Sequence, residues 1–438
     1  MKRFVRPGAF LLLAALLFCL SGCYSGNIDQ YFSLPMASEE YRQLQSLIDE
    51  ELASGSEYAA PIHGSYRQSV QLSDVDGDGA DEALAFFRDA AKNPKINIYD
   101  SENGEHRLAL SISGEGSSIG RIDYADLTGD GQKELLVSWQ ISSGLSVLGV
   151  YSLAGWSGDV LLSTDSAEFV TGDINRDGCD ELLNLRAANS TTYLVDQYTF
   201  PLGQEPQATS AALSAGISAL QRLRMVTLAG DAPALLAEST LTTGDLVSDL
   251  FVCRDGSLIN LTMNRTTQIS ETRRSYSLVY AQDIDGDGST EIPHPQQLYS
   301  RGDEVFWSIA WFRYDASGRA STIMTTYHCV TDNWYLVLPS GWDVGLTVRR
   351  DDSVSGERAV ILSQLRSDGS LEDYVAIYAI TGENRYERAR LDNRFLLQEE
   401  GTTVYAAKIL DGKTDENTIR SRFHVIYTDW SSGSVVGG

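Results

Sequence analysis

The strongest constraint on the fold is a nine-residue acidic motif that occurs four times, beginning at Asp74, Asp126, Asp173 and Asp283. Its first copy reads Asp-Val-Asp-Gly-Asp-Gly-Ala-Asp-Glu and leads directly into an apolar stretch. Oxygen-bearing side chains recur at every second position, and glycines between them allow the backbone to turn sharply. Hard divalent cations take six to eight oxygen ligands, so side-chain oxygens at positions 1, 3, 5 and 9 with a carbonyl at position 7 suit Ca²⁺. The four copies, named loop 74, loop 126, loop 173 and loop 283 after their first residues, predict a calcium-binding repeat protein.

The spacing of the strand-like segments indicates one repeating unit. Tyr99, Tyr151 and Tyr198 each lie 25 residues after the start of a loop, and each ends a short apolar run. This constant interval predicts a unit of strand, loop, strand, strand, turn and strand. Loop 173 and loop 283 start 110 residues apart, which predicts a hidden repeat near residue 228. The segment 226–237 fits that place, although it lacks the carboxylates and should bind no metal.

Repeats of this size are typical of the blades of a β-propeller. Four-stranded units of 47 to 64 residues cannot bury both faces alone, so each needs a neighbour on either side. We predict an all-β fold, a β-propeller of about seven four-stranded blades, with six blades plus a C-terminal cap as the alternative. A seventh unit, built from 402–407 and 423–427, seems short of strands unless one from about 57–65 completes it. The propeller is expected to span 66–438, with repeats starting near residues 66, 118, 167, 222, 275, 331 and 395.

The N-terminal residues have the pattern of a targeting segment followed by a helix. A basic start precedes an apolar run at 9–20, which is too short for a membrane span. Leu20-Ser21-Gly22-Cys23 then resembles the lipobox of bacterial lipoproteins, in which the cysteine is lipidated and becomes the mature N-terminus. The resemblance implies a signal peptide at 1–22, a lipid anchor at Cys23 with a tether at 23–37, and an extracytoplasmic location on the cell membrane of a bacterium. Ordinary signal cleavage near this cysteine is the alternative. Helical spacing predicts a short helix and a lead-in strand within 38–65.

The net charge excludes one class of partner. The chain has 34 basic and 60 acidic residues, a formal net charge of −26. Phosphate backbones are bound by clustered Lys and Arg, so we expect no nucleic acid partner. Cys179, Cys253 and Cys329 are too far apart to suggest a disulfide framework or a metal site, and we expect single buried thiols.

The acidic motif, followed by a Leu- and Val-rich strand, resembles the FG-GAP and VCBS repeats of integrin-like propellers. In those repeats calcium lies in the hairpin between the first two strands of a blade, and the resemblance covers about 66–300 well. An EF-hand would need an acidic residue at position 12, where this chain has Ala85, Val137, Asn184 and His294. By position, the resemblance implies up to four structural Ca²⁺ ions held by Asp74, Asp76, Asp78, Ala80 and Glu82; Asp126, Thr128, Asp130, Gln132 and Glu134; Asp173, Asn175, Asp177, Cys179 and Glu181; and Asp283, Asp285, Asp287, Ser289 and Glu291. Thr128 is a neutral ligand, so loop 126 should bind more weakly.

No catalytic motif is present in the sequence. The five histidines are scattered, and no zinc motif, nucleophile elbow or phosphate-binding loop occurs. Tryptophans within strands, among them Trp307 and Trp311, are expected to belong to the core more often than to a sugar-binding face.

These features predict a surface-anchored, calcium-stabilised propeller that acts as an extracellular binding or adhesion module. Its expected partners are the membrane, through the N-terminal lipid, and an extracellular protein or carbohydrate ligand. The alternatives are a polysaccharide-active enzyme on a propeller scaffold and a structural scaffold of an envelope complex.

Overall fold

The computed structural model describes residues 39–102, 105–300 and 302–427. The predicted signal peptide, Cys23 and the tether lie outside this range. The described chain is mostly β, and it begins with the predicted N-terminal helix, α3 (Glu39–Ala53). Leu44 and Ile48, one turn apart, bury one side of α3 against Phe87 of the first sheet. No helix among the described residues is long and apolar enough to cross a membrane.

The first four sheets follow one another along the chain and share one topology. In each, four consecutive strands pair antiparallel in chain order, and the first sheet gains a short extra strand. The first sheet has β1 (Glu57–Tyr58), β2 (Val70–Ser73), β3 (Glu82–Arg88), β4 (Pro94–Glu102) and β5 (Glu105–Ser113); the second has β6 (Ser118–Ala125), β7 (Glu134–Ser142), β8 (Leu145–Tyr151) and β9 (Val160–Ser166); the third has β10 (Glu168–Gly172), β11 (Glu181–Ala187), β12 (Tyr193–Thr199) and β13 (Gln207–Ala212); the fourth has β14 (Ile217–Leu228), β15 (Ala232–Leu241), β16 (Leu246–Arg254) and β17 (Ser257–Asn260).

The regular interval in the sequence corresponds to one position in these sheets. Tyr99, Tyr151 and Tyr198 lie on β4, β8 and β12, which are the third strands of the sheets defined by β2–β5, β6–β9 and β10–β13. Cys253 takes the same place on β16 of the fourth sheet. The segment near residue 228 is therefore a full four-stranded unit, in which a short turn at Ala229, Gly230 and Asp231 replaces the acidic loop.

The fifth and sixth sheets depart from this plan. The fifth contains β20 (Glu291–Gln297), β21 (Trp307–Tyr314), β22 (Ala320–Cys329), β23 (Trp334–Val337) and β29 (Phe423–Val425), and the sixth contains β24 (Leu346–Asp351), β25 (Glu357–Leu365), β26 (Leu371–Ile380), β28 (Thr403–Ile409) and β27 (Phe395–Glu400). The remaining elements are the hairpin β18 (Met263–Asn264) and β19 (Ile269–Ser270) and the short helices α4 (Arg385–Arg388), α5 (Glu416–Arg420), η1 (Ala154–Trp156), η2 (Val330–Asp332) and η3 (Leu391–Asn393).

The C-terminal strands do not form the predicted seventh unit. β28 pairs with β26 in the sixth sheet, whereas β29 returns to pair with β23 in the fifth. Similarly, β1 does not complete a last blade but pairs with β3 in the first sheet. The described residues thus form six sheets of four or five strands, and the sixth begins at Leu346 rather than near residue 331. The physical reason is burial, because Val404, Ala406 and Ala407 are fully buried within the sixth sheet.

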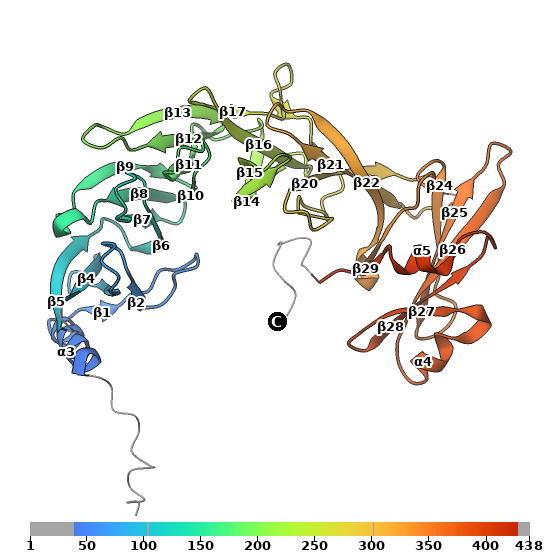
Figure 1. Ribbon diagram of the computed structural model, residues 1–438, viewed down its shortest axis with the longest axis horizontal. Helices are drawn as coiled ribbons and strands as arrows, with labels where there is room; N and C mark the ends of the chain where they lie inside the picture. Colours follow the sequence, from blue (N-terminus) through green and yellow to red (C-terminus); the bar gives the residue numbers. More distant parts are fainter. Residues whose placement is uncertain (1–38, 103–104, 301, 428–438) are drawn as a thin grey trace, which may run out of the picture.

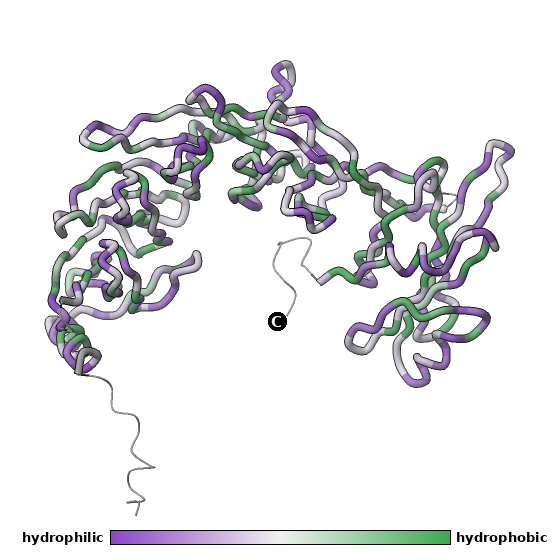
Figure 2. The backbone as a smooth tube through the Cα atoms, viewed as in Figure 1, coloured by the Kyte–Doolittle hydropathy of each residue, from purple (hydrophilic) through white to green (hydrophobic). Residues whose placement is uncertain are grey.

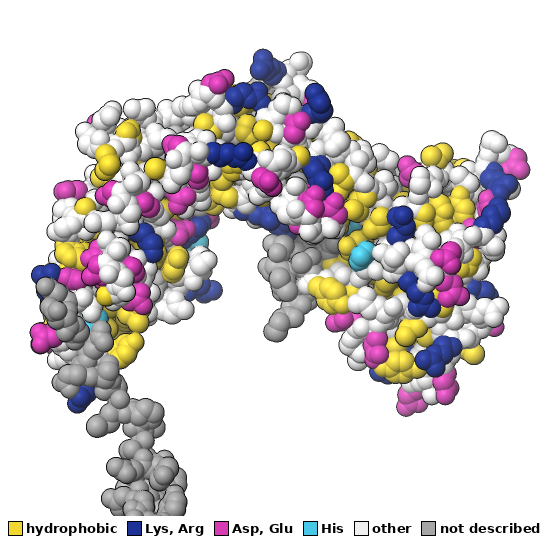
Figure 3. Space-filling view, in the orientation of Figure 1, with side chains coloured by type: hydrophobic (Ala, Val, Ile, Leu, Met, Phe, Trp, Pro, Cys, Tyr) yellow, Lys and Arg dark blue, Asp and Glu magenta, His cyan; other side chains and the backbone are white. Residues whose placement is uncertain are grey.

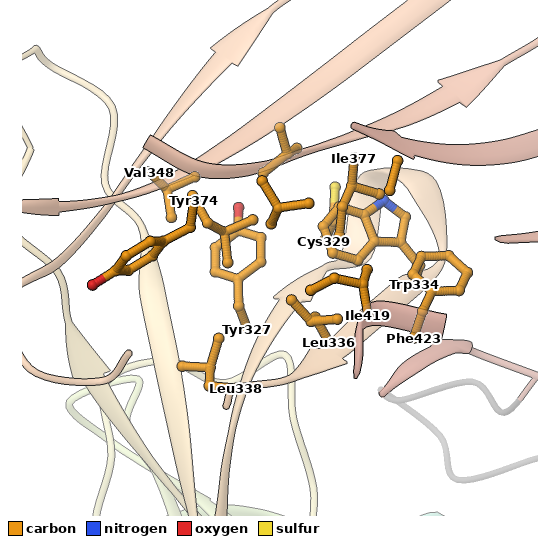
Figure 4. Packing of buried hydrophobic residues seen from close by; sticks show 14 of the residues in the cluster. Tyr327, Cys329, Trp334, Leu336, Leu338, Val348, Tyr374, Ile377, Ile419 and Phe423 are labelled. Carbon is orange, nitrogen blue, oxygen red and sulfur yellow. The ribbon is translucent and has the colours of Figure 1, made fainter. Parts of the chain in front are cut away.

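The six sheets follow one another around an open arc, with the first and sixth sheets at opposite ends (Figure 1). Hydrophobic residues lie mainly within the strands, and hydrophilic residues gather in the turns (Figure 2). Each sheet shares an apolar cluster with the next, and the largest cluster lies between the fifth and sixth sheets. There Tyr327, Trp334 and Leu336 face Val348 and Ile377 (Figure 4). Packing between neighbouring sheets therefore forms the core of the arc.

The cysteines and tryptophans have different degrees of burial. Cys179, Cys253 and Cys329 form no disulfide; Cys329 is buried as expected, whereas Cys179 and Cys253 are only partly buried. Trp311 and three further described tryptophans belong to the core, as expected, whereas Trp156 and Trp307 are partly exposed.

Candidate metal centres

The acidic loops occupy equivalent places in the sheets. Loops 74, 126 and 173 join the first strand to the second, and loop 283 leads directly into β20. In three of the loops, glycines with positive φ occupy positions 4 and 6, for example Gly77 at 80° and Gly79 at 89°. Loop 173 has Arg176 at position 4, which adopts φ 66° despite its side chain. This left-handed backbone lets each loop curl around its own carboxylates.

The aspartate at position 1 organises each turn. Asp74 accepts hydrogen bonds from Gly77 N at 2.8 Å and from Gly79 N at 3.1 Å. Asp126 and Asp283 accept from the corresponding amides of their own loops at 2.7 to 3.0 Å. The aspartate at position 5 accepts from the amide at position 7 in all four loops, at 2.7 to 2.9 Å. These bonds hold the carboxylates in place on the inner side of the turn.

The glutamate at position 9 is the most buried acidic residue of each loop. Glu82, Glu134, Glu181 and Glu291 begin β3, β7, β11 and β20 and are at most 3% exposed. One carboxylate oxygen of each accepts the amide of position 2, at 2.8 to 3.2 Å. Each loop therefore closes on a buried anion. Burial, opposed only in part by these hydrogen bonds, raises the pKa of all four carboxyl groups.

Loop 74 contains the densest group of carboxylates. The ligand oxygens of Asp74, Asp76 and Asp78 lie within 4.8 Å of one another, and so do those of Asp76, Glu82 and Asp100. Burial, followed by repulsion from the neighbouring aspartates, raises the pKa of Glu82 to about 7. Its Oε1 atom is buried and has no hydrogen-bond partner among the described residues. A buried, unpartnered carboxylate oxygen beside other carboxylates is the arrangement that a divalent cation would neutralise.

Asp100 is a candidate ligand that the motif does not contain. It follows Tyr99 on β4, and the pair Ala83–Tyr99 in the β3–β4 ladder places Asp100 directly across from Glu82. Only 6% of its surface is exposed. The constant interval of 25 residues between the loop start and Tyr99 could have indicated Asp100, the next residue. The nine-residue motif does not include it, because the motif ends at the start of β3 and Asp100 lies on β4.

Loops 126 and 173 have fewer carboxylates. Thr128 Oγ1 lies 3.4 Å from Glu134 Oε1, and Asn175 Nδ2 donates to Glu181 Oε1 at 2.6 Å. The neutral residues Ser152 and Thr199 lie across from Glu134 and Glu181, one step beyond the pairs Leu135–Tyr151 and Leu182–Tyr198. Neutral oxygen atoms repel carboxylates less, so a cation would relieve less electrostatic repulsion in these loops than in loop 74.

Loop 283 has a basic side chain where loop 74 has Asp100. Arg313 pairs with Glu291 across β20 and β21. Its guanidinium contacts Glu291 Oε1 at 2.7 Å and the Oδ2 atoms of Asp285 and Asp287 at 2.8 Å each. One arginine thus neutralises three of the predicted ligands, and sequence analysis missed it because it lies 30 residues after the loop start, behind a longer loop.

Neighbouring loops also contact one another. Lys133, at position 8 of loop 126, donates its amide to Val75 O at 3.0 Å and its ammonium group to Asp74 O at 2.9 Å. Asp180 of loop 173 donates its amide to Asp126 O at 3.2 Å. The loops therefore link the first three sheets in addition to shaping each hairpin.

Among the comparisons with known proteins, only the solved structures give matches. No family model matches the chain, and no curated protein matches it. Among solved structures, the chain is similar to a putative 6-phosphogluconolactonase from Bacteroides fragilis, with a TM-score of 0.27 and 11% sequence identity. The match covers 73% of this chain and 92% of that one.

Proposed function

We propose that this chain is a calcium-stabilised, lipid-anchored binding module with a propeller-like arc of sheets, displayed outside a bacterial cell membrane. The observation that carries the calcium proposal is the buried Oε1 of Glu82, which faces Asp76 and Asp100 without a partner among the described residues. The lipid anchor rests on the sequence around Cys23. The binding role rests on the arrangement of large, rigid sheets with polar loops at their edges.

The four loops differ in their need for Ca²⁺. Loop 74 presents five carboxylates, including Asp100, and is the strongest candidate. Loops 126 and 173 supply carboxylates together with neutral oxygens. In loop 283 the guanidinium of Arg313 lies among the carboxylates, so it competes directly with a metal ion. Three calcium sites with one arginine-neutralised loop therefore fit these side chains better than four equivalent sites.

The ion would act structurally. Extracellular calcium modules bind at about 10⁻⁴ to 10⁻³ M. At millimolar calcium, a site with a dissociation constant of about 10⁻⁴ M stabilises the folded state by roughly 1.4 kcal/mol. Three such sites together amount to a sizeable share of the 5–15 kcal/mol that is typical for a folded domain.

The test is a thermal melt of the chain from Tyr24 onward, first in EDTA and then with Ca²⁺ or Mg²⁺. Ca²⁺ should raise the melting temperature by several degrees, about 2–4 °C per kcal/mol for a chain of this size or larger, and Mg²⁺ should do less. Asp76→Asn combined with Asp78→Asn should remove much of that increase.

Asp81→Asn is the matched control. Asp81 lies in the same loop and is exposed, and the substitution removes the same type of charge without touching a proposed ligand. It should keep the calcium response. An identical melting temperature with and without Ca²⁺ would rule out the structural metal, and the loops would then be acidic turns only.

A further inference from the structure

Two adjacent cavities lie where the fifth sheet meets the sixth. One, of about 180 Å³, is lined by ten residues, which are Tyr276, Leu278, Val305, Phe306, Trp307, Tyr327, His328, Val330, Thr331 and Arg350. The other, of about 230 Å³, shares Phe306 and Arg350 with it. The side chains of Leu278 and Val305 are about half exposed at this place. Hydrophobic side chains are also visible among charged ones over the fifth and sixth sheets (Figure 3).

The charge of the smaller cavity is opposite to that of the protein as a whole. The chain has 60 acidic residues, yet among the described residues no carboxylate lines this cavity. Arg350 is its one charged side chain, because burial lowers the pKa of His328 to about 3 and keeps the imidazole neutral. Across the described residues, Arg350 forms no ion pair, and its guanidinium lies 5.8 Å from the ring centre of Phe306. An exposed, unpaired guanidinium is a ready partner for an anion.

Arg349, the neighbour of Arg350 on β24, differs from it because its guanidinium is paired with a carboxylate. Arg349 binds both carboxylate oxygens of Asp373, at 2.7 and 2.6 Å. Glu304 is the one carboxylate that lines the larger cavity, and it does not reach the smaller one. The smaller cavity is therefore the place where an incoming anion meets a positive charge without a competing carboxylate.

Neutral polar groups accompany this charge. Tyr327 is 2% exposed and lines the cavity, so its hydroxyl is a polar group available at the cavity wall. Its ring extends from β22 toward Val348 on β24 (Figure 4). A phenol hydroxyl at a cavity wall can hydrogen-bond to a ligand or to water. Thr331 offers a second hydroxyl group at the exposed side.

Aromatic rings form the apolar wall. Tyr276 and Trp307 are both partly exposed, and their ring centres lie 5.4 Å apart at an interplanar angle of 30°. Rings of this kind pack against the C–H face of a sugar, whereas hydroxyl donors and acceptors fix its orientation. The cavity is small, so a monosaccharide unit suits it better than a folded partner or a long peptide.

We propose that this cavity binds an acidic saccharide, with the carboxylate on Arg350 and the sugar ring against Tyr276 and Trp307. The inference deepens the proposed binding function and rests on it, but it does not depend on the calcium loops. Hydroxyl groups of the sugar would hydrogen-bond to the hydroxyl of Tyr327. The ligand class is a sugar unit that carries a carboxylate, such as a uronic acid.

Binding is tested by titrating the full chain with digalacturonate, using calorimetry and the fluorescence of the partly exposed tryptophans. Arg350→Gln should weaken binding about tenfold or more, which corresponds to about 1.4 kcal/mol, because the charge-assisted bond is lost. Trp307→Leu should weaken both digalacturonate and its neutral counterpart galactobiose. Arg319→Gln, an equal charge change at an exposed site outside both cavities, should change nothing.

The following results would contradict the proposed saccharide site. Equal affinity for galactobiose and digalacturonate, or unchanged binding by Arg350→Gln, would overturn the assignment. A short peptide that binds through its terminal carboxylate while digalacturonate does not would replace the saccharide with a peptide. All titrations are run both in EDTA and in Ca²⁺, so that a failed calcium proposal, seen in the melting temperature, is distinguishable from a failed saccharide site.

Discussion

One side chain across the ladder from the loop glutamate adds a different charge to each acidic loop. The residues in this place are Asp100, Ser152, Thr199 and Arg313, so the site changes from acidic through neutral to basic along the chain. Positions 1, 5, 6 and 9 of the nine-residue motif are constant while this position varies. We therefore predict that one substitution outside the motif can create or remove a metal requirement.

Replacing Arg313 should convert loop 283 into a calcium-dependent loop. In Arg313→Ser the carboxylates of Asp285, Asp287 and Glu291 lose their common partner, so we expect a loss of about 2 kcal/mol in EDTA. Millimolar Ca²⁺ should restore most of it, and calcium titration should show one additional bound ion. Arg319→Ser is the control because Arg319 is exposed. A variant that loses stability without gaining a calcium response would show that Arg313 has a packing role only.

His294 should make folding sensitive to mild acid. Burial, with the nearby positive charge of Arg274, lowers the pKa of His294 to about 4, compared with about 6.5 in the unfolded chain. The unfolded state then binds more protons between these values, so stability is complete above pH 6.5 and falls as the pH decreases toward 4. The loss from this one group amounts to about 2 kcal/mol at pH 5.

The carboxyl groups with raised pKa values change stability in the opposite direction, so the measurement is a difference between variants. Urea unfolding at pH 7.5 and pH 5 should show a smaller acid loss for His294→Asn than for the parent chain. His63→Asn serves as the control because His63 is exposed. Equal pH dependence in all three chains would contradict the prediction.

Among the strands, the sequence predicted the elements that repeat and missed those that do not. Tyr99, Tyr151 and Tyr198 fall on third strands because alternating burial imposes the same local pattern each time. The last strands follow no such repeat. Val404 and Ala406 are apolar in either arrangement, and only contact with β26 assigns them to the sixth sheet rather than to a seventh.

Some residues of the candidate sites could likewise be predicted from the sequence, and others could not. Ligand positions within one loop could be predicted, since spacing along the chain fixes them. Asp100, Arg313 and Arg350 could not, because their neighbours come from other strands and their effect depends on a pairing register that spacing alone does not determine.

A buried ion pair connects the fourth sheet to the segment before the fifth. Glu238 on β15 is fully buried, and its Oε1 accepts hydrogen bonds from Arg274 Nη2 and Ser248 Oγ at 2.9 Å and from Ala281 N at 3.0 Å. Glu238→Ala would leave the buried guanidinium of Arg274 without its main partner. We expect a loss of about 3–5 kcal/mol in urea unfolding.

The exposed pair Arg273–Asp245 supplies the comparison. The side chain of Arg273 is 47% exposed, so Arg273→Ala should cost no more than about 1 kcal/mol. Similar losses for the two variants would mean that the Glu238 network adds little to the junction between these sheets.

Across the whole arc, the proposed need for calcium is unevenly distributed. Loops 74, 126 and 173 connect strands of the first three sheets and contact one another through Lys133 and Asp180. Beyond them, the fourth sheet has a plain turn, loop 283 has Arg313, and the fifth and sixth sheets share the largest apolar cluster. The N-terminal half should therefore depend on the ion, and the C-terminal half on side-chain packing.

Hydrogen exchange in EDTA and in millimolar Ca²⁺ tests this division. Chelation should speed exchange within 70–187, foremost at the amides of Val75, Leu127 and Ile174 that donate to the loop glutamates, and leave 291–427 unchanged. With about 1.4 kcal/mol per site, protection should fall about tenfold where opening is local. In Arg313→Ser the calcium effect should extend to the amide of Ile284, which donates to Glu291. Faster exchange throughout the chain would instead indicate that the six sheets open as one cooperative unit, with the loops stabilising the whole arc rather than its first half.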